Sequence, residues 1–341
     1  MNAKIPMPGI ELVTVSATIG SGKNGCCDGS AATARFNFSS FAMLRLRDGR
    51  VLVVDFSNHH IRVVTTDLRR VWTLDARFGH PSGLAQLPDG RVLVAEYSSH
   101  RIRLLSAELQ EVSTPVGGVA EEFFRPTALA VLADGSVLVA DSGRHRIRRL
   151  SADLERVSTV AGGEMGYRDG AAAQFCSPDG LAVLPDGSVL VADRDNNRIR
   201  LLSADLQHVT TVGGDGTYGC RDGAMVQALF CHPQGLTLLP DGRVLVAQDD
   251  RNIRVLSADL QRVSTLTLVG VEHAYAFAVL PDGRVLVAGD SRVRVLAGLA
   301  AANPKPAAKA KRIGAANPAA AAKRVCRGVA SVHHLTNSMS E

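Results

Sequence analysis

Aromatic side chains are scarce in this sequence: they make up 4% of its 341 residues, and Trp72 is the only tryptophan. Hydrophobic residues still amount to 46%, so a core has to be built mainly from Val, Leu, Ile and Ala. No run of about 18 or more apolar residues occurs, which argues against a membrane-spanning helix. The segment Met1–Ile10 holds two prolines and no apolar stretch of signal-peptide length. We therefore expect an intracellular protein, in the cytoplasm or the nucleus, that does not contact a membrane.

The six cysteines lack the Cys-x-x-Cys spacing and the closely spaced histidines that mark zinc sites and redox centres. Cys176 and Cys231 occupy equivalent positions in repeated units, as do Cys26 and Cys220. Such repetition indicates inheritance by duplication. We expect free thiols in a reducing compartment, no metal site and no cofactor.

An excess of positive charge is missing from most of the chain, although the formal net charge of the whole is +5. Seven of the 38 basic residues and one of the 33 acidic residues follow Leu299, so the preceding part is close to neutral. A nucleic-acid surface there would need clustered basic residues. The Ala-, Lys- and Pro-rich segment 300–341 cannot bury a core and is predicted to be a disordered tail. Its basic clusters, 305–312 and 323–327, suit contact with nucleic acid or an acidic partner, a weak nuclear signal or a solubilising role.

An internal repeat dominates the rest of the sequence. The pattern Asp-Gly-[Arg/Ser]-Val-Leu-Val recurs six times at intervals of 41 to 55 residues. Units of this size fit the blades of a β-propeller, which need about 40–50 residues each. The six dipeptides are Asp48-Gly49, Asp89-Gly90, Asp134-Gly135, Asp186-Gly187, Asp241-Gly242 and Asp282-Gly283.

One unit, residues 175–214, shows the internal plan. Polar turns, among them Pro185-Asp186-Gly187, separate four short apolar segments, which is typical of an antiparallel meander. Because these strands are apolar on both faces, each sheet needs a cover on both sides, and blades stacked around an axis provide it. The expected strands are Leu181–Leu184, Val189–Ala192, Arg198–Leu202 and Val209–Val212.

The repeated unit resembles the NHL repeat. The patterns F-x-x-P-x-G-[LI]-A-V, D-G, V-A-D and N-x-R-I follow in this order, and the resemblance extends over about Glu11 to Leu299. The family's connection G-x-x-D-G-x-x-x-A-x-F is similar to Gly25–Phe36, Gly166–Phe175 and Gly219–Phe230. WD-type propellers are disfavoured because no Gly-His and Trp-Asp pair recurs. The resemblance implies an all-β protein, a six-bladed β-propeller.

The sixth unit lacks a fourth strand. Its strands are expected at Ala276–Leu280, Val285–Ala288 and Val293–Leu296, and the Ala-rich tail follows directly. The N-terminal segment Glu11–Gly20 is similar to Arg156–Gly162, the fourth strand of another unit. We predict that residues 11–19 form the outer strand of the last blade and close the ring. The domains are then an extension (1–10), a propeller (11–299) and the tail (300–341).

A ligand site is expected where the units differ. The turns after the first and third strands are nearly uniform, whereas the connections on the opposite face vary from unit to unit, as ligand-binding loops and drifting loops both do. Two residues before each first strand, at the mouth of the central channel, six positions form a set that suits a small polar ligand or a peptide loop, or that simply faces solvent. The set is Phe41, Ser82, Thr127, Asp179, Gln234 and Tyr275.

Three kinds of propeller enzyme can be compared with this set. Peptidyl-amidating lyases resemble the family in fold and hold zinc with three histidines, but the set has none, and His80 and His232 lie further out on non-adjacent units. Regucalcin-like lactonases hold a divalent ion with carboxylates and amides, for which only Asp179 and Gln234 qualify. Strictosidine-synthase-like propellers use a buried glutamate that the set lacks. We predict no catalytic residues.

Acids at the end of the second strands have a structural interpretation. Arginines follow them closely, and hydrogen bonds of the acids to these arginines or to the backbone would brace the next loop. The acids are Asp55, Glu96, Asp141 and Asp193, the nearby arginines Arg101, Arg146 and Arg198. Histidines of the same loops are expected to make hydrogen bonds within the loops; they are His59, His60, His100 and His145.

The sequence therefore favours a monomeric, non-enzymatic scaffold that binds a protein, a peptide or a small ligand on its variable face. Two alternatives stay open. One is a hydrolase or lyase of the lactonase or amidating-lyase kind with an unrecognised site. The other is an RNA-binding NHL propeller; nucleic acid would then bind the tail or the face of the ring, with an affinity that falls steeply with salt.

Overall fold

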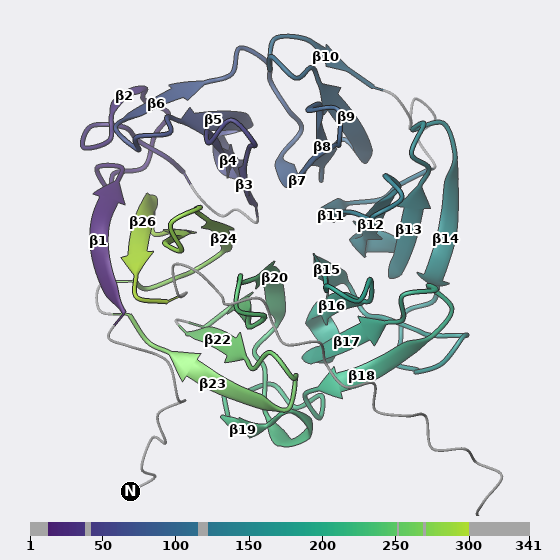
Figure 1. The fold of residues 1–341 in the computed structure, drawn as a ribbon. Helices are drawn as coiled ribbons and strands as arrows, with labels where there is room; N and C mark the ends of the chain where they lie inside the picture. The colour runs from purple at the N-terminus through teal and green to yellow at the C-terminus, as the bar shows by residue number, and fades with distance from the viewer. Residues whose placement is uncertain (1–12, 38–41, 115–121, 251, 269–270, 300–341) are drawn as a thin grey trace, which may run out of the picture. The chain divides into compact units, whose positions relative to one another are not determined.

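The computed structural model describes residues 13–37, 42–114, 122–250, 252–268 and 271–299. Within them the chain forms six antiparallel sheets, and the innermost strands of neighbouring sheets pack side by side around a closed ring (Figure 1). The predicted six-bladed β-propeller is confirmed. The predicted extension and tail lie outside the described residues. No helix in the described ranges is long and apolar enough to cross a membrane.

The first three blades are numbered in chain order, and their strands run from the channel outward. Blade 1 has β3 (Met43–Arg45), β4 (Val51–Asp55), β5 (His60–Val64) and β6 (Arg70–Thr73). Blade 2 has β7 (Pro81–Gln86), β8 (Val92–Glu96), β9 (Arg101–Leu105) and β10 (Val112–Ser113). Blade 3 has β11 (Pro126–Val131), β12 (Val137–Asp141), β13 (Arg146–Leu150) and β14 (Val157–Gly162).

The other three blades follow the same plan. Blade 4 has β15 (Pro178–Val183), β16 (Val189–Asp193), β17 (Arg198–Leu202) and β18 (Val209–Gly213). Blade 5 has β20 (Pro233–Leu238), β21 (Val244–Gln248), β22 (Ile253–Leu256) and β23 (Arg262–Leu266). Blade 6 has β24 (Ala276–Val279), β25 (Val285–Gly289), β26 (Arg292–Ala297) and β1 (Thr14–Ile19).

Short elements complete the blades. β2 (Gly29–Ser30) and β19 (Gly223–Ala224) add a fifth strand to blades 1 and 5. Four single-turn 3-10 helices lie in the connections: η1 (Phe56–Asn58), η2 (Ser142–Arg144), η3 (Arg194–Asn196) and η4 (Met225–Gln227).

The second strand of every blade is buried along its whole length. In β16, Val189, Leu190 and Val191 have no exposed surface. Both faces of these strands pack against neighbouring blades, so the core consists of clusters between adjacent blades rather than one central mass. One cluster joins Leu190 of blade 4 to Val244 of blade 5. The apolar Val-Leu-Val repeat is therefore the sequence signature of a strand that is covered on both sides.

The Asp-Gly turns behave as predicted. Gly187 has a φ of +87°, a conformation that glycine adopts without a steric penalty, and Asp186 Oδ1 accepts a hydrogen bond from Ser188 N–H at 3.0 Å. This turn joins the first strand to the second in each of the six blades.

The N-terminal strand closes the ring. β1 pairs antiparallel with β26, from Thr14 opposite Ala297 to Ile19 opposite Val293. This confirms that the segment completes blade 6. Its first predicted residues, 11 and 12, lie outside the described ranges. Ile19 is 1% exposed and packs in a cluster with residues of blades 1 and 6, so the strand contributes to the core as well as to the sheet.

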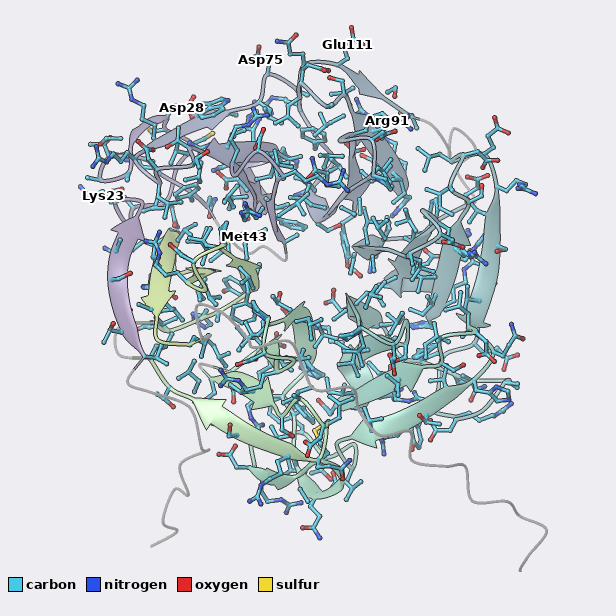
Figure 2. All side chains as sticks on the ribbon, viewed as in Figure 1. Lys23, Asp28, Met43, Asp75, Arg91 and Glu111 are labelled. Carbon is cyan, nitrogen blue, oxygen red and sulfur yellow. The ribbon has the colours of Figure 1, made fainter. Side chains whose placement is uncertain are left out.

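Three connections fold over the outer edge of the blade that follows them; we call segments 20–36, 163–175 and 214–230 the latch loops. In the second one, Gly170 bridges to Val209 of β18, and Asp169 accepts hydrogen bonds from the backbone and the side chain of Thr211, both at 3.1 Å. Figure 2 shows the equivalent Asp28 at the outer edge of blade 1, whereas Met43 lies at its inner end. These are the segments in which the sequence contains the family's connection motif.

A fully buried arginine holds each latch loop. In blade 4, Arg200 contacts Asp193 Oδ2 at 2.6 Å and Asp169 Oδ1 at 2.7 Å, donates to the carbonyl of Arg168 and lies over the ring of Phe175. Removing one member of such a pair would leave a buried charge without compensation. The same arrangement recurs around Arg62 with Asp28 and around Arg254 with Asp222.

Arginines do brace the acids that end the second strands, but not always the predicted ones. Arg146 donates to Asp141 at 2.6 Å, as predicted. In blade 4 the predicted partner Arg198 is wrong, because Arg200 takes its place beside Asp193. Side chains two residues apart share a face of a strand, so spacing alone did not separate the two candidates. Arg198 instead donates to the carbonyl of Asp215.

Side chains of the loop histidines connect neighbouring blades. His100 Nδ1 accepts a hydrogen bond from Arg125 N–H at 3.1 Å, and His145 Nδ1 accepts one from Ser177 N–H at 3.0 Å. Between blades 4 and 5, Asn197 Oδ1 takes the same role. Each of these residues ends the loop between the second and third strands of its blade. Its side chain accepts a hydrogen bond from a backbone N–H just before the first strand of the next blade.

Deleting residues 1–19 is expected to give an aggregating protein with a markedly lower melting temperature. The deletion removes β1, exposes the edge of β26 and uncovers the cluster around Ile19. Melting temperature and light scattering of the full chain and the deletion variant measure this. A fully stable, monomeric deletion variant would refute the role of β1 in closure.

Candidate functional site

The predicted set of channel-mouth residues lies at the start of the innermost strands. Ser82, Thr127, Asp179 and Gln234 are buried, with 1%, 4%, 6% and 5% of their surface exposed, and Tyr275 is half-buried. Phe41 lies outside the described residues. The positions are therefore less open to solvent than strand ends at a surface would be.

Two members of the set form hydrogen bonds between adjacent blades. Ser82 Oγ donates to the carbonyl of Pro126 at 2.7 Å, and Thr127 Oγ1 donates to the carbonyl of Asp179 at 3.2 Å. Each hydroxyl thus joins its blade to the next one. The glycine after Ser82 allows the close approach of blades 2 and 3, because a Cβ on Gly83 would lie 2.1 Å from the carbonyl oxygen of Thr127.

The channel between the inner strands contains a small cavity. Its volume is about 100 Å³, and Ser82, Thr127 and Asp179 are among its lining residues, whereas Gln234 and Tyr275 are not. Pockets for drug-sized ligands have roughly 300–1,000 Å³. The cavity therefore holds a few water molecules or the tip of a larger ligand, such as an ammonium group.

Asp179 is the unusual member of the set. Burial raises the pKa of its carboxyl group to about 6, although the charge of Arg194 and a hydrogen bond from Thr127 act in the opposite direction. Among the described residues, no cation lies within salt-bridge distance of it. A carboxylate that is desolvated and lacks an ion pair is costly to the folded state.

Asp249, which directly follows β21 of blade 5, is contacted by three polar side chains and lies close enough to Asp179 for its charge to act on that carboxyl group. Gln234 Nε2 donates to Asp249 Oδ1. Arg194 Nη2 lies 3.2 Å from Asp249 Oδ2, and His232 Nδ1 lies 3.0 Å from the same oxygen. Gln234 therefore faces this surface group rather than the channel.

Blade 6 contributes a second histidine–carboxylate pair. His273 Nδ1 lies 3.2 Å from Asp290 Oδ1, and the ring of His273 stacks on Tyr275 with 5.9 Å between ring centroids and an interplanar angle of 5°. Burial, followed by the charges of Asp290 and Asp249, raises the pKa of Tyr275. We call Asp179, Gln234, Tyr275 and the two pairs the mouth cluster.

Sequence reasoning missed Arg194, Asp249, His273 and Asp290. One signal was available: blades 5 and 6 lack the acid that ends the second strand elsewhere, with Gln248 and Gly289 in its place. In blade 5 the Gln248 side chain accepts the hydrogen bond from Cys231 N–H at 3.2 Å, and in blade 6 Asp290 accepts one from Glu272 N–H at 2.8 Å, so other residues take over the bracing contacts there. In the described ranges, no three His, Cys, Asp or Glu residues are grouped so that they could hold a metal ion.

Comparison with known proteins supports the repeat. Residues 78–103, 123–150 and 175–200 match the NHL repeat. A curated relative, the protein SUPPRESSOR OF QUENCHING 1, chloroplastic, from Arabidopsis thaliana, is 32% identical over 116 residues. The match covers 32% of this chain and 11% of that protein, so the chain spans only a small part of its relative's length.

Solved structures are similar in fold. An auxiliary nutrient binding protein from Bacteroides thetaiotaomicron has a TM-score of 0.68 at 12% identity, over 84% of this chain and 76% of its own. A gluconolactonase from Xanthomonas campestris has a TM-score of 0.60 at 16% identity, over 76% and 87%. A streptogramin B lyase has a TM-score of 0.55 at 12% identity, over 77% and 96%. At such identities the likeness concerns the fold alone.

The matched repeats, the six sheets and the latch loops agree with one another. The chain is a six-bladed β-propeller, and three of its repeated units match the NHL repeat.

Proposed function

We propose that this propeller binds a ligand that presents a primary ammonium group, such as a lysine side chain of a peptide or a small amine, at the mouth cluster of blades 4 to 6. The observation that carries the proposal is the carboxyl group of Asp179, which is 6% exposed and has no ion pair in the described part of the chain. An ammonium ion would supply the missing charge.

Energetics support this use of Asp179. A pKa raised from 3.8 to about 6 corresponds to a cost of about 3 kcal/mol for the ionised carboxyl group in the folded state. Binding sites commonly contain a group that destabilises the ligand-free protein in this way, because the bound ligand compensates its charge. The other fully buried acids of the blades differ from Asp179. Asp55 and Asp193 each have a buried arginine beside them.

The surroundings of Asp179 suit an extended ligand. A cavity of about 100 Å³ accepts an ammonium group but not a whole ligand. Above it, the carboxylates of Asp249 and Asp290 and the stacked rings of His273 and Tyr275 offer polar and aromatic contacts. Together they would hold the rest of a peptide or small molecule whose ammonium group lies in the channel.

Replacing Asp179 with Asn is expected to stabilise the ligand-free protein by up to about 3 kcal/mol above pH 6. Because the pKa is raised on folding, the folded state binds more protons between pH 3.8 and about 6. The natural protein therefore loses this stability as the pH rises through that window, whereas the variant does not. Urea unfolding at several pH values measures the difference, which should vanish below about pH 4. Equal stability at all pH values would contradict the raised pKa.

The binding test uses N-acetyl-lysine amide as probe and the uncharged N-acetyl-norleucine amide as control ligand. Calorimetry should show affinity for the lysine probe alone. Affinity should be about tenfold weaker near pH 5 than near pH 7.5, because the proton competes with the ammonium group for Asp179. Asp179→Asn should abolish binding, while Asp195→Asn, on the same face but exposed, should change it less than about twofold. Equal binding of both probes, or of the Asp179 variant, would refute the proposal.

A hydrolase or lyase activity is the second candidate, because of the two histidine–carboxylate pairs. A carboxylate that holds Nδ1 leaves Nε2 of His232 or His273 free to act as a general base. The fold likeness to a gluconolactonase suggests a lactone as first substrate. Opening of glucono-δ-lactone should then exceed the rate in buffer and fall by about 100-fold in His273→Asn or His232→Asn. A rate equal to that of buffer would eliminate this candidate for the lactone.

A further inference from the structure

Exposed apolar side chains are concentrated in two latch loops. In the described part of the chain, five large hydrophobic side chains are classed as exposed, and four of them lie in segments 163–175 and 214–230. Met165 is 68% exposed, Tyr167 46%, Tyr218 56% and Val226 69%. Together they form what we call the rim patch, at the outer edge of blades 4 and 5.

One arginine makes the two loops continuous. The guanidinium of Arg198 lies 3.8 Å from the ring centroid of Tyr167 and donates to the carbonyl of Asp215 at 2.5 Å. Tyr167 belongs to the first loop and Asp215 to the second. Arg198 therefore links the two loops of the rim patch across the boundary between two blades. Tyrosine and arginine are also the residue types enriched among the residues that dominate binding energy at protein interfaces.

The fold itself does not require these apolar side chains. The latch loop of blade 1 has the same bridges and the same buried arginine contacts. Counting from its Asp28, it has Asn24 where the other loops have Met165 and Tyr218. Likewise it has Cys26 where blade 4 has Tyr167, and Ala32 where blade 5 has Val226. A latch loop thus forms with polar or small residues at these positions, and the rim patch needs another explanation.

The rim patch carries one negative and one positive side chain, so two copies of it can complement each other in charge. Glu164 and Arg168, both exposed, lie on either side of Met165 and Tyr167. In the described residues neither side chain has an ion pair, whereas the neighbouring Asp169 forms one with Arg200. A surface with one unpaired cation and one unpaired anion, separated by apolar residues, matches an inverted copy of itself. A partner charged strongly with one sign would leave one of the two groups facing a like charge.

We infer that the rim patch is the contact surface for a second copy of this chain, in a two-fold symmetric dimer. A two-fold axis places the same segment of both subunits against each other in opposite directions. Glu164 of one subunit then meets Arg168 of the other, twice, and Met165 and Tyr167 pack between the two ion pairs. The rim patch adjoins the mouth cluster at Tyr218, whose ring centroid lies 5.1 Å from that of His232. The inference does not depend on ligand binding at the mouth cluster.

Sedimentation velocity of the full chain, from about 1 to about 200 μM, should show a monomer–dimer equilibrium. The variant Met165→Asn/Val226→Ala introduces the residues of the blade 1 loop and should weaken dimerisation at least tenfold. Its melting temperature measured at a concentration where both proteins are monomeric should stay unchanged. As a matched control, Val15→Ala removes the fifth exposed hydrophobic side chain, on β1, and should leave the dimer intact.

Charge reversal tests the two-fold arrangement itself. Glu164→Lys and Arg168→Glu should each weaken the dimer at least tenfold, because each places like charges opposite each other. The double variant exchanges the two charges and should restore dimerisation to within about threefold of the natural protein. A loss of folding would not reproduce this restoration. If the full chain is a monomer at every concentration, or if the double variant is weaker than both single variants, the inference is wrong, and the first outcome would assign the patch to a different protein.

Discussion

Every blade of this propeller is apolar on both faces, so each one needs a neighbour on either side to be stable. This constraint explains most of the structure. It demands a closed ring, which the chain achieves by using β1 as the last strand of blade 6. It also spreads the core over the contacts between blades, and it explains why polar groups near the channel, such as Ser82 and Thr127, are used to join one blade to the next. What remains of the channel is small.

The elements that follow from local chemistry could be predicted from the sequence. Asp-Gly marks the first turn of each blade, and Val-Leu-Val marks the strand buried on both sides. The strand Arg198–Leu202 has the bounds that its pattern indicates. Closure by the N-terminal segment was also predictable, because a missing strand and a surplus strand are both visible in a repeat. The arginine that holds a latch loop was not: Arg198 and Arg200 point to the same side of β17, and only the packed loop distinguishes them.

The mouth cluster was hard to predict for a different reason. The pairing between first and second strands shifts near the predicted positions, for example between Pro178 and Leu181 and between Pro233 and Leu236. Such irregularities redirect side chains, so counting along the strand does not tell which of them enter the channel. Asp179 lines the cavity, whereas Gln234 at the equivalent position turns to Asp249. Asp249 itself follows a strand whose usual terminal acid is absent, and only the structure shows what replaces that acid.

A comparison of the buried acids separates two uses of a carboxylate in this repeat. Asp55 and Asp193 are as buried as Asp179, but each accepts hydrogen bonds from a buried arginine and from an asparagine three residues on. These partners use the two carboxylates to brace a loop, although burial also raises the pKa of Asp193. Asp179 has no such partners, and the latch loops of blades 4 and 5 carry apolar residues where that of blade 1 has none. Asp179 in one blade and the exposed apolar residues in two of the three latch loops each carry a cost that another copy of the unit avoids. Since the fold forms without that cost in other copies, this contrast is the common basis of the binding proposals for Asp179 and for the rim patch.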